Sequence, residues 1–298
     1  MRLILIVCIL LSTHMIGPAF GQHQPLITVE QLKQSLNDDT LVILDIRSPR
    51  KSRNFYEEGH IDGAIAAPYN EGWRATVDGV IGMLPAVPEI SDHIGGLGIS
   101  NDSNVVIVPH GNSSTDFSAA TRIYWTFKVL GHDAVSILEG GYAAWLAKGG
   151  RLSKKSTTLE PKIFKADFRE ELVSSEQDVQ QSLNDATLLV DARPSAQYLG
   201  KAKSPVVKRA GTIPEAVNLR QSTLYDPRNT TFLSQSELKA LTHDLSISES
   251  GKSITFCNTG HWASIAWFAL SEIAGQENVS LYDGSMAEWT EKDSNPVQ

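Results

Sequence analysis

Cys257 is the residue of this chain whose type and surroundings most favour covalent chemistry. Residues 253–256 are apolar, β-branched or aromatic in the manner of a buried strand, and small and polar residues follow at 258–260. The apolar residues at 265–270 then predict a helix. Loop N–H groups can converge on a thiol placed where a strand gives way to a helix, and the helix dipole favours its thiolate form. The position indicates a nucleophilic or sulfur-carrying cysteine, with an inert buried cysteine as the alternative.

Length and composition indicate an ordinary globular protein with room for two domains. The chain has 298 residues, of which 41% are hydrophobic and 20% charged, values that exclude a disordered or coiled-coil protein. The formal net charge is −8. Phosphate backbones are bound by clustered Lys and Arg, and no such cluster occurs, so we expect no nucleic-acid partner.

The first 21 residues resemble a secretory signal peptide. Arg2 precedes a short apolar run at 3–11, and the small residues Ala19 and Gly21 predict cleavage before Gln22. The run is too short to span a membrane, so we expect export, most simply to a bacterial periplasm, without a stable membrane anchor. An uncleaved anchor is the alternative. Cleavage would remove Cys8 and leave Cys257 as an unpaired thiol in a compartment that permits disulfides, which favours a functional role for it.

The chain contains an internal duplication. Three stretches occur twice and in the same order: 34–47 and 181–193, 59–64 and 211–216, and 138–145 and 282–289. Matches of this length indicate a duplicated domain. The place that corresponds to Cys257 in the first copy reads His110-Gly111-Asn112-Ser113-Ser114, with no thiol. Only the second copy is therefore equipped for thiol chemistry.

The duplication defines the expected domains and their fold. We assign the chain to a signal peptide, a first domain without the catalytic cysteine, a linker and a second, catalytic domain, at residues 1–21, 22–150, 151–173 and 174–298. Thr28 and Ser175 each begin a capping-box pattern at the start of a helix. Short apolar strands then alternate with helices, which predicts an α/β fold in which each domain is a mainly parallel sheet flanked by helices on both faces. Cys257 would lie at the carboxyl end of a strand, where ligands bind in such sheets.

The order of these motifs resembles the tandem-domain rhodanese family, the thiosulfate and 3-mercaptopyruvate sulfurtransferases, and is most similar to its exported bacterial members. The resemblance extends over the whole mature chain and rests on six motifs: Asp45-x-Arg47, the Gly59–Ala64 stretch, Gly140-Gly141 with Trp145, Asp191-x-Arg193, the Cys257 loop and Asp283-Gly284-Ser285. It implies two rhodanese-like domains with an inactive first copy. It also implies that Cys257 takes a sulfane sulfur as a persulfide and passes it to cyanide or a thiol.

Within the loop, each residue type suits such a reaction. Backbone amides from Asn258 to Trp262 could cradle the persulfide or the leaving anion, Gly260 permits close backbone approach and Thr259 can donate a side-chain hydrogen bond. Rhodanese-like phosphatases instead need an Arg at the end of a longer loop. Here the sixth residue after Cys257 is Ala263, so we expect no phosphate clamp.

The choice of sulfur donor depends on basic residues near the loop. His261 could bring partial positive charge or donate to a bound anion, or it could simply face solvent. Mercaptopyruvate enzymes of the family carry an Arg where this chain has Gln197. Arg209 could replace it, or could be a solvated loop charge. Thiosulfate is therefore the expected first donor.

Four further residues are candidates outside the loop. Asp191 and Arg193 are expected to form a structural ion pair near the site, as are their counterparts in the first copy. His60 could orient substrate in the cleft or be an interior hydrogen-bonded histidine, and Arg74 is a candidate anion contact.

Other functional classes receive little support from the sequence. We find no metal-ligand spacing and no nucleotide-binding loop, so we expect no metal and no cofactor, and we expect a monomer. A persulfide carrier or partner-docking module with little turnover is the alternative to an enzyme.

Overall fold

The computed structural model describes residues 24–226, 228, 231–247 and 251–298. The predicted signal peptide, residues 1–21, lies outside the described residues. Within the described residues, no helix is both long and apolar enough to cross a membrane.

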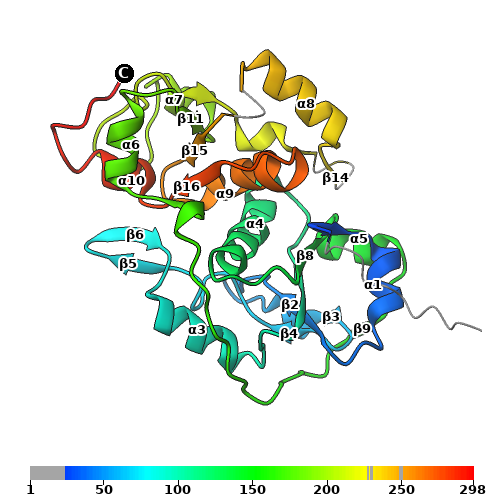
Figure 1. The fold of residues 1–298 in the computed structure, drawn as a ribbon. Helices are drawn as coiled ribbons and strands as arrows, with labels where there is room; N and C mark the ends of the chain where they lie inside the picture. Colours follow the sequence, from blue (N-terminus) through cyan, green and yellow to red (C-terminus); the bar gives the residue numbers. More distant parts are fainter. Residues whose placement is uncertain (1–23, 227, 229–230, 248–250) are drawn as a thin grey trace, which may run out of the picture.

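Each half of the chain forms a five-stranded sheet (Figure 1). The strand order of the first sheet is β1 (Leu26–Ile27), β8 (Val135–Leu138), β7 (Asn104–Val108), β2 (Leu41–Asp45) and β4 (Ile65–Ala66). The order of the second is β10 (Val173–Ser174), β16 (Val279–Tyr282), β15 (Ser253–Phe256), β11 (Leu188–Asp191) and β12 (Val217–Asn218). Every pairing in both sheets is parallel. The predicted duplicated α/β fold is confirmed.

Helices cover both faces of each sheet. In the first domain they are α1 (Val29–Ser35), α2 (Phe55–Glu58), α3 (Val87–Gly96), α4 (Ser114–Val129) and α5 (Gly141–Ala147). In the second they are α6 (Glu176–Ser182), α7 (Ser195–Tyr198), α8 (Gln235–Asp244), α9 (His261–Phe268), which continues as a π-turn over Ala269–Ile273, and α10 (Ser285–Trp289). The capping boxes expected at Thr28 and Ser175 are both present, so the local sequence sets where α1 and α6 begin.

Shorter elements complete the chain. Three pairs of short strands are antiparallel: β3 (His60–Ile61) with β9 (Leu152–Ser153), β5 (Ala75–Val77) with β6 (Val80–Met83), and β13 (Tyr225–Asp226) with β14 (Thr231–Phe232). Two single-turn helices occupy Glu170–Leu172 and Gln221–Thr223. In the segment between the domains, Phe164 is buried and belongs to the core, whereas Phe168 is 40% exposed.

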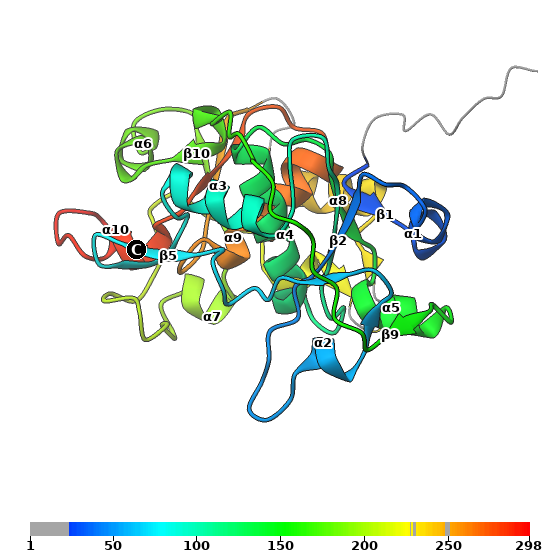
Figure 2. The same cartoon turned by 90° about the horizontal axis from the view of Figure 1, so that it is seen from below.

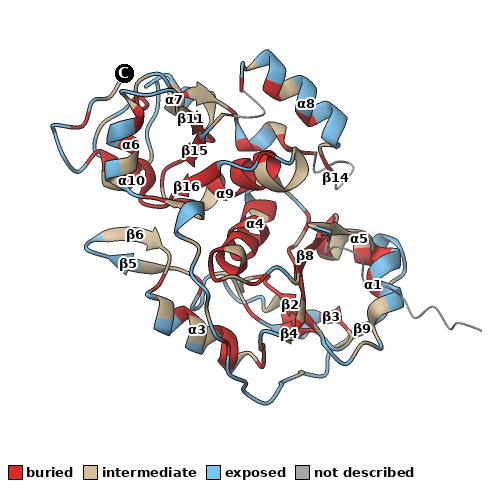
Figure 3. Cartoon of the chain, in the orientation of Figure 1, coloured by how far each residue is buried: buried red, intermediate tan, exposed pale blue. Residues whose placement is uncertain are grey.

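The hydrophobic core is continuous between the two domains. Alternate strand residues face opposite sides of a sheet, and in β2 Val42 and Leu44 face the inner side while Ile43 faces α1 and α5. The inner cluster extends across α4 and α9 to the second sheet, and both helices lie between the sheets and are largely buried (Figures 1 and 3).

Aromatic side chains fill this interface. Phe117 on α4 lies 4.8 Å from the ring of Tyr225 and 5.5 Å from that of Phe232, both in the second domain. Thr121 and Ser264 share a buried hydrogen bond of 2.9 Å between α4 and α9. The two domains are thus held in one arrangement by a closely packed, mainly apolar interface that includes this buried polar contact.

Candidate active site

Cys257 follows the last residue of β15 and precedes the loop into α9, as the sequence predicts. It is 1% exposed and is the free cysteine of the described chain. The loop lies at the carboxyl end of the second sheet and faces the first domain, which supplies α4 and the β5–β6 hairpin to the site (Figure 1). The candidate site is therefore an interdomain one.

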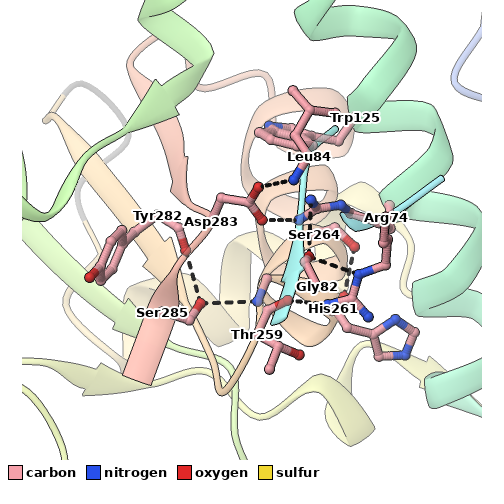
Figure 4. Close-up of polar contacts among 12 residues, drawn as sticks. Arg74, Gly82, Leu84, Trp125, Thr259, His261, Ser264, Tyr282, Asp283 and Ser285 are labelled. Carbon is pink, nitrogen blue, oxygen red and sulfur yellow. Dashed lines mark hydrogen bonds and ion pairs between the residues drawn. The ribbon is translucent and has the colours of Figure 1, made fainter. Parts of the chain in front are cut away.

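Ser285, the first residue of α10, holds the loop from within the second domain. Its Oγ accepts hydrogen bonds from the N–H of Cys257 at 3.0 Å and of Gly260 at 3.1 Å, and donates to the carbonyl of Tyr282 at 2.9 Å (Figure 4). The next two N–H groups of α10 donate to the carbonyls of Cys257 and Asn258, at 3.0 and 2.9 Å. Ser285 adopts a left-handed φ of 51°, and these bonds compensate for the strain of that conformation.

These contacts decide which loop amides remain free. The N–H of Gly260 is occupied by Ser285, so it cannot serve the sulfur. Among the described residues, the amides of Asn258, Thr259, His261 and Trp262 donate to no protein acceptor. Four N–H groups next to Cys257 are therefore available to a persulfide or an anion.

Gly260 lies against an ion pair between the two domains. Arg122 of α4 and Asp283, which follows β16, approach to 2.5 Å and are both buried. The N–H of Leu84, just after β6, donates to the second carboxylate oxygen at 2.6 Å (Figure 4). A Cβ on Gly260 would come within 2.4 Å of both Arg122 Nη1 and Asp283 Oδ1, and its φ is 72°. Only glycine fits at this position.

Arg122 is a site residue that the sequence analysis missed. Burial alone would lower the pKa of its guanidinium, but the Asp283 carboxylate, and after it the nearby Tyr69 and Cys257, raise that pKa above its ordinary value. The available signal was the only charged residue in the stretch 117–127, which otherwise holds apolar, small and hydroxyl residues, because an arginine is rarely buried without a partner.

Arg74 lies at the Cys257 loop. Its Nη2 donates to the carbonyl of Thr259 and its Nε donates to the carbonyl of Gly82 at 2.9 Å (Figure 4). Both acceptors are neutral, and within the described residues no carboxylate pairs with this guanidinium. Arg74 therefore brings uncompensated positive charge to the loop.

His261 joins the two domains and is neutral. Its Nε2 lies 3.0 Å from the carbonyl of Thr115, which can only accept, so Nδ1 must accept from the Tyr69 hydroxyl at 2.8 Å. Burial, then the charges of Arg74 and Arg122, lower the pKa of His261 to about 3. The histidine thus brings no positive charge near neutral pH, in contrast to one of its two sequence interpretations, and its nitrogens do not simply face solvent, in contrast to the other.

Two further loop side chains also contact protein. Asn258 Nδ2 donates to Gln197 Oε1 at 2.9 Å, while Asn258 Oδ1 is buried without a partner. Trp262 Nε1 donates to the hydroxyl of Thr115 at 3.2 Å. Asn258 and Trp262 are therefore positioned by side-chain contacts, and their backbone amides are the groups left for a ligand.

Arg209 and His60 are placed away from these contacts. Arg209 donates to the carbonyls of Asn295 at 2.8 Å and Lys292 at 2.7 Å, and so anchors the C-terminal segment. His60 is fully buried, with its ring nitrogens 2.8 and 3.1 Å from the carbonyls of Tyr56 and Lys155. The structure gives both residues structural contacts, and for His60 these match the interior alternative.

Asp191 and Arg193 form the buried ion pair expected from the sequence. The guanidinium contacts the carboxylate through Nε at 2.9 Å and Nη2 at 2.5 Å, and Nη2 also donates to the carbonyl of Gly211 at 2.8 Å. Asp45 and Arg47 repeat this arrangement in the first domain with the carbonyl of Gly59. These pairs tie the end of a strand to the next loop. No group of three or more potential ligands in the described part of the chain could hold a metal ion.

The interdomain ion pair predicts a specific stability defect. Arg122→Gln should lower the free energy of unfolding by about 3–5 kcal/mol, because it leaves the Asp283 carboxylate buried without a cation. Adding Asp283→Asn should recover part of this loss. Urea unfolding of both variants measures the effect, with Arg151→Gln as control because that side chain is 77% exposed. A loss no larger than that of the control would contradict the assigned role.

The lowered pKa of His261 predicts acid sensitivity. An unfolded histidine binds a proton near pH 6.5, whereas the native one resists protonation down to about pH 3, so its contribution to stability is present above about pH 6.5 and is lost as the pH falls. The native chain should lose about 1–3 kcal/mol more than His261→Gln between about pH 7 and pH 4. Unfolding curves across this range test it, with His243→Gln, at a 91% exposed side chain, as control. Parallel pH profiles for the native chain and His261→Gln would refute the assignment.

Comparison with known proteins agrees with this geometry. The family model for the rhodanese-like domain matches residues 28–148 and 175–292. The thiosulfate sulfurtransferases of Rattus norvegicus and Bos taurus are each 30% identical, over 90% and 80% of this chain and 92% and 80% of their own. The crystal structure of SseA from Escherichia coli, described among 3-mercaptopyruvate sulfotransferases, superimposes with a TM-score of 0.74 and 25% identity over 88% of this chain and 98% of its own. The chain therefore belongs to the rhodanese family.

Proposed function

We propose that this protein is a sulfurtransferase that moves sulfane sulfur from thiosulfate, or a related donor such as 3-mercaptopyruvate, through a persulfide on Cys257. The observation that carries the proposal is the loop geometry. Four amides of the loop that follows the thiol, at Asn258, Thr259, His261 and Trp262, have no acceptor among the described residues. Two arginines of the other domain reach this loop: Arg74 binds the Thr259 carbonyl, and Arg122 lies beside Gly260 in its ion pair with Asp283. Such a site can stabilise a thiolate, a persulfide anion and a departing oxyanion in turn.

The reaction has two displacement steps. The Cys257 thiolate attacks the outer sulfur of thiosulfate, the sulfur–sulfur bond breaks, and sulfite leaves with the bonding electron pair. Cyanide or a thiolate then attacks the outer sulfur of the persulfide, takes it as thiocyanate or a new persulfide, and returns the Cys257 thiolate. No net proton transfer is needed with thiosulfate and cyanide, which suits a site without a charged histidine.

Arg74 supports thiosulfate as the first donor. Thiosulfate carries two negative charges, and the loop itself supplies no cation because His261 is neutral. Arg74, bound to the Thr259 carbonyl, brings a guanidinium whose charge no carboxylate offsets within the described residues. The position at which mercaptopyruvate enzymes of the family carry an Arg is occupied by Gln197, whose Oε1 accepts from Asn258.

The burial of Cys257 supports turnover with small acceptors over a docking role. A sulfur atom on a residue that is 1% exposed can be reached by cyanide or a small thiol more readily than by the surface of a partner protein. One chain supplies both sides of the site, which is consistent with a working monomer.

Thiocyanate formation tests the proposed activity. The native chain should convert thiosulfate and cyanide in a ping-pong pattern, and Cys257→Ser, which keeps the side-chain size but loses the nucleophile, should retain less than about 1% of the rate. Thiosulfate should also give a higher kcat/KM than 3-mercaptopyruvate. Intact-mass measurement after donor exposure should show one added sulfur that cyanide removes.

Each result that contradicts the proposed activity leads to a different conclusion. Equal rates for the native chain and Cys257→Ser would exclude the cysteine mechanism. A stable persulfide without turnover would indicate a carrier, and an unmodified mass would indicate a docking module. A higher kcat/KM for 3-mercaptopyruvate would reverse the donor assignment while leaving the sulfur transfer intact.

We also propose that the protein is exported to a bacterial periplasm after cleavage before Gln22. The basis is the sequence alone: Arg2, the apolar run at 3–11 and the small residues at 19 and 21. N-terminal sequencing of the full-length protein expressed in a bacterial host should yield a mature chain that begins at Gln22, recovered in the periplasmic fraction. An uncleaved chain in the membrane fraction would support the anchor alternative instead.

A further inference from the structure

A cavity of about 580 Å³ lies in the first domain, at the carboxyl end of its sheet. This place corresponds to the candidate active site of the second domain. All of its lining residues belong to the first domain. They come from the segment after β2, from α2, from the loop that leads into α4 and from α5. Figure 2 shows the segment before α2 projecting at the lower edge of the molecule, on the same side as α5. The volume of the cavity is within the range of small-ligand sites.

The duplication shows which part of the second domain the cavity corresponds to. The loop at 110–114 corresponds to the Cys257 loop, and the Gly140-Gly141 turn corresponds to the turn before Ser285. In this copy the loop amides are already occupied. The Asp116 carboxylate accepts hydrogen bonds from the N–H of His110 at 3.2 Å, Gly111 at 2.6 Å and Asn112 at 3.3 Å. A ligand must therefore bind in front of the loop rather than within it.

One arginine of the cavity has no carboxylate partner. Three arginines line the cavity, and two of them are paired: Arg47 with Asp45 in the buried ion pair described above, and Arg53 with Glu58 at the surface. Within the described part of the chain, no ion pair is found for Arg50. Burial above all, opposed by Asp116 and assisted by the arginines, lowers the pKa of His110, so the imidazole is neutral. Arg50 is left as an uncompensated, exposed cation at the opening.

Planar side chains, both aromatic rings and guanidinium groups, line the cavity. The Arg47 guanidinium stacks 3.5 Å from the Tyr142 ring, and that of Arg53 lies 4.7 Å over Phe55. The Phe55 ring meets His110 edge-on at 4.5 Å. Planar groups thus form two sides of a space whose opening carries a free guanidinium, an arrangement that suits a ligand with a flat apolar body and an anionic head.

We propose that this first-domain cavity binds a small organic anion, with a phosphate or carboxylate head at Arg50 and Arg53 and an aromatic or apolar body against Phe55 and Tyr142. The ligand is bound and not transformed, because the loop here has no thiol. The site is distinct from the Cys257 loop and does not depend on the proposed sulfur transfer. Arg53 can turn to the ligand at low cost because its contact with Glu58 is exposed.

Isothermal titration calorimetry with phenyl phosphate at low ionic strength tests the proposal. Phenyl phosphate should bind the full-length protein, and Arg50→Ala should weaken its binding about ten-fold, as expected for loss of one charge-assisted contact. Phe55→Ala should weaken phenyl phosphate but leave inorganic phosphate unchanged. Arg151→Ala, at an exposed arginine outside the cavity in the segment that follows the first domain, should bind like the native chain. Cys257→Ser should also bind normally, which separates this site from the catalytic one.

Three results would overturn the proposal. The first is no heat above dilution when phenyl phosphate is added to the native chain. The second is equal binding by Arg50→Ala and Arg151→Ala. The third is loss of binding in Cys257→Ser, which would place the ligand at the catalytic loop. Far-ultraviolet circular dichroism of each variant confirms that it is folded. A failure of thiosulfate turnover would bear on none of these outcomes.

Discussion

The buried ion pair between Arg122 and Asp283 is the constraint on which the site depends. Removing two charges from water is costly, and the pair persists because the contact is close and the Leu84 N–H satisfies the other carboxylate oxygen. Asp283 lies two residues before Ser285, whose Oγ accepts hydrogen bonds from the amides of Cys257 and Gly260. The geometry of the nucleophile is therefore linked to the packing of α4 from the other domain, and the loop can be complete only when the two domains are in contact.

The contacts between domains are partly reciprocal, as a duplicated chain allows. Tyr69 of the first domain donates to His261 at the catalytic loop, and Tyr225 of the second donates to the carbonyl of Gly111 in the thiol-free loop at 3.0 Å. Each domain thus uses a tyrosine to hold the other's loop. Burial raises the pKa of both hydroxyls, so both remain protonated donors. Within the described residues, no cation of the second domain pairs in return with a carboxylate of the first, so the Arg122–Asp283 ion pair is not reciprocal.

The sequence predicted what is local or repeated. Short apolar strands, capping boxes at Thr28 and Ser175 and the duplicated motifs define the two parallel sheets, and the strand-to-helix setting identifies Cys257. The partners of the loop were harder to find because they come from the other domain: Arg122 is 161 residues from Asp283, and Arg74 is 185 residues from Thr259. Pattern and propensity carry no information about such pairs. Neutral His261 shows the same limit, since only the tertiary contacts with Tyr69 and Thr115 fix its charge.

The two loops show how one backbone arrangement yields a reactive site in one copy and an inert one in the other. In the first copy a carboxylate of the chain itself, Asp116, fills the amide cradle, and burial raises the pKa of that carboxyl even though His110 and the loop N–H groups oppose the shift. In the second copy Ser285 takes the amides of Cys257 and Gly260 and leaves four others free. A neutral hydroxyl organises the loop without supplying negative charge, whereas a carboxylate at the same distance would repel an incoming thiosulfate and destabilise a thiolate. The first copy therefore differs from the second in more than the missing thiol, because the carboxyl group of Asp116 already fills its amide cradle.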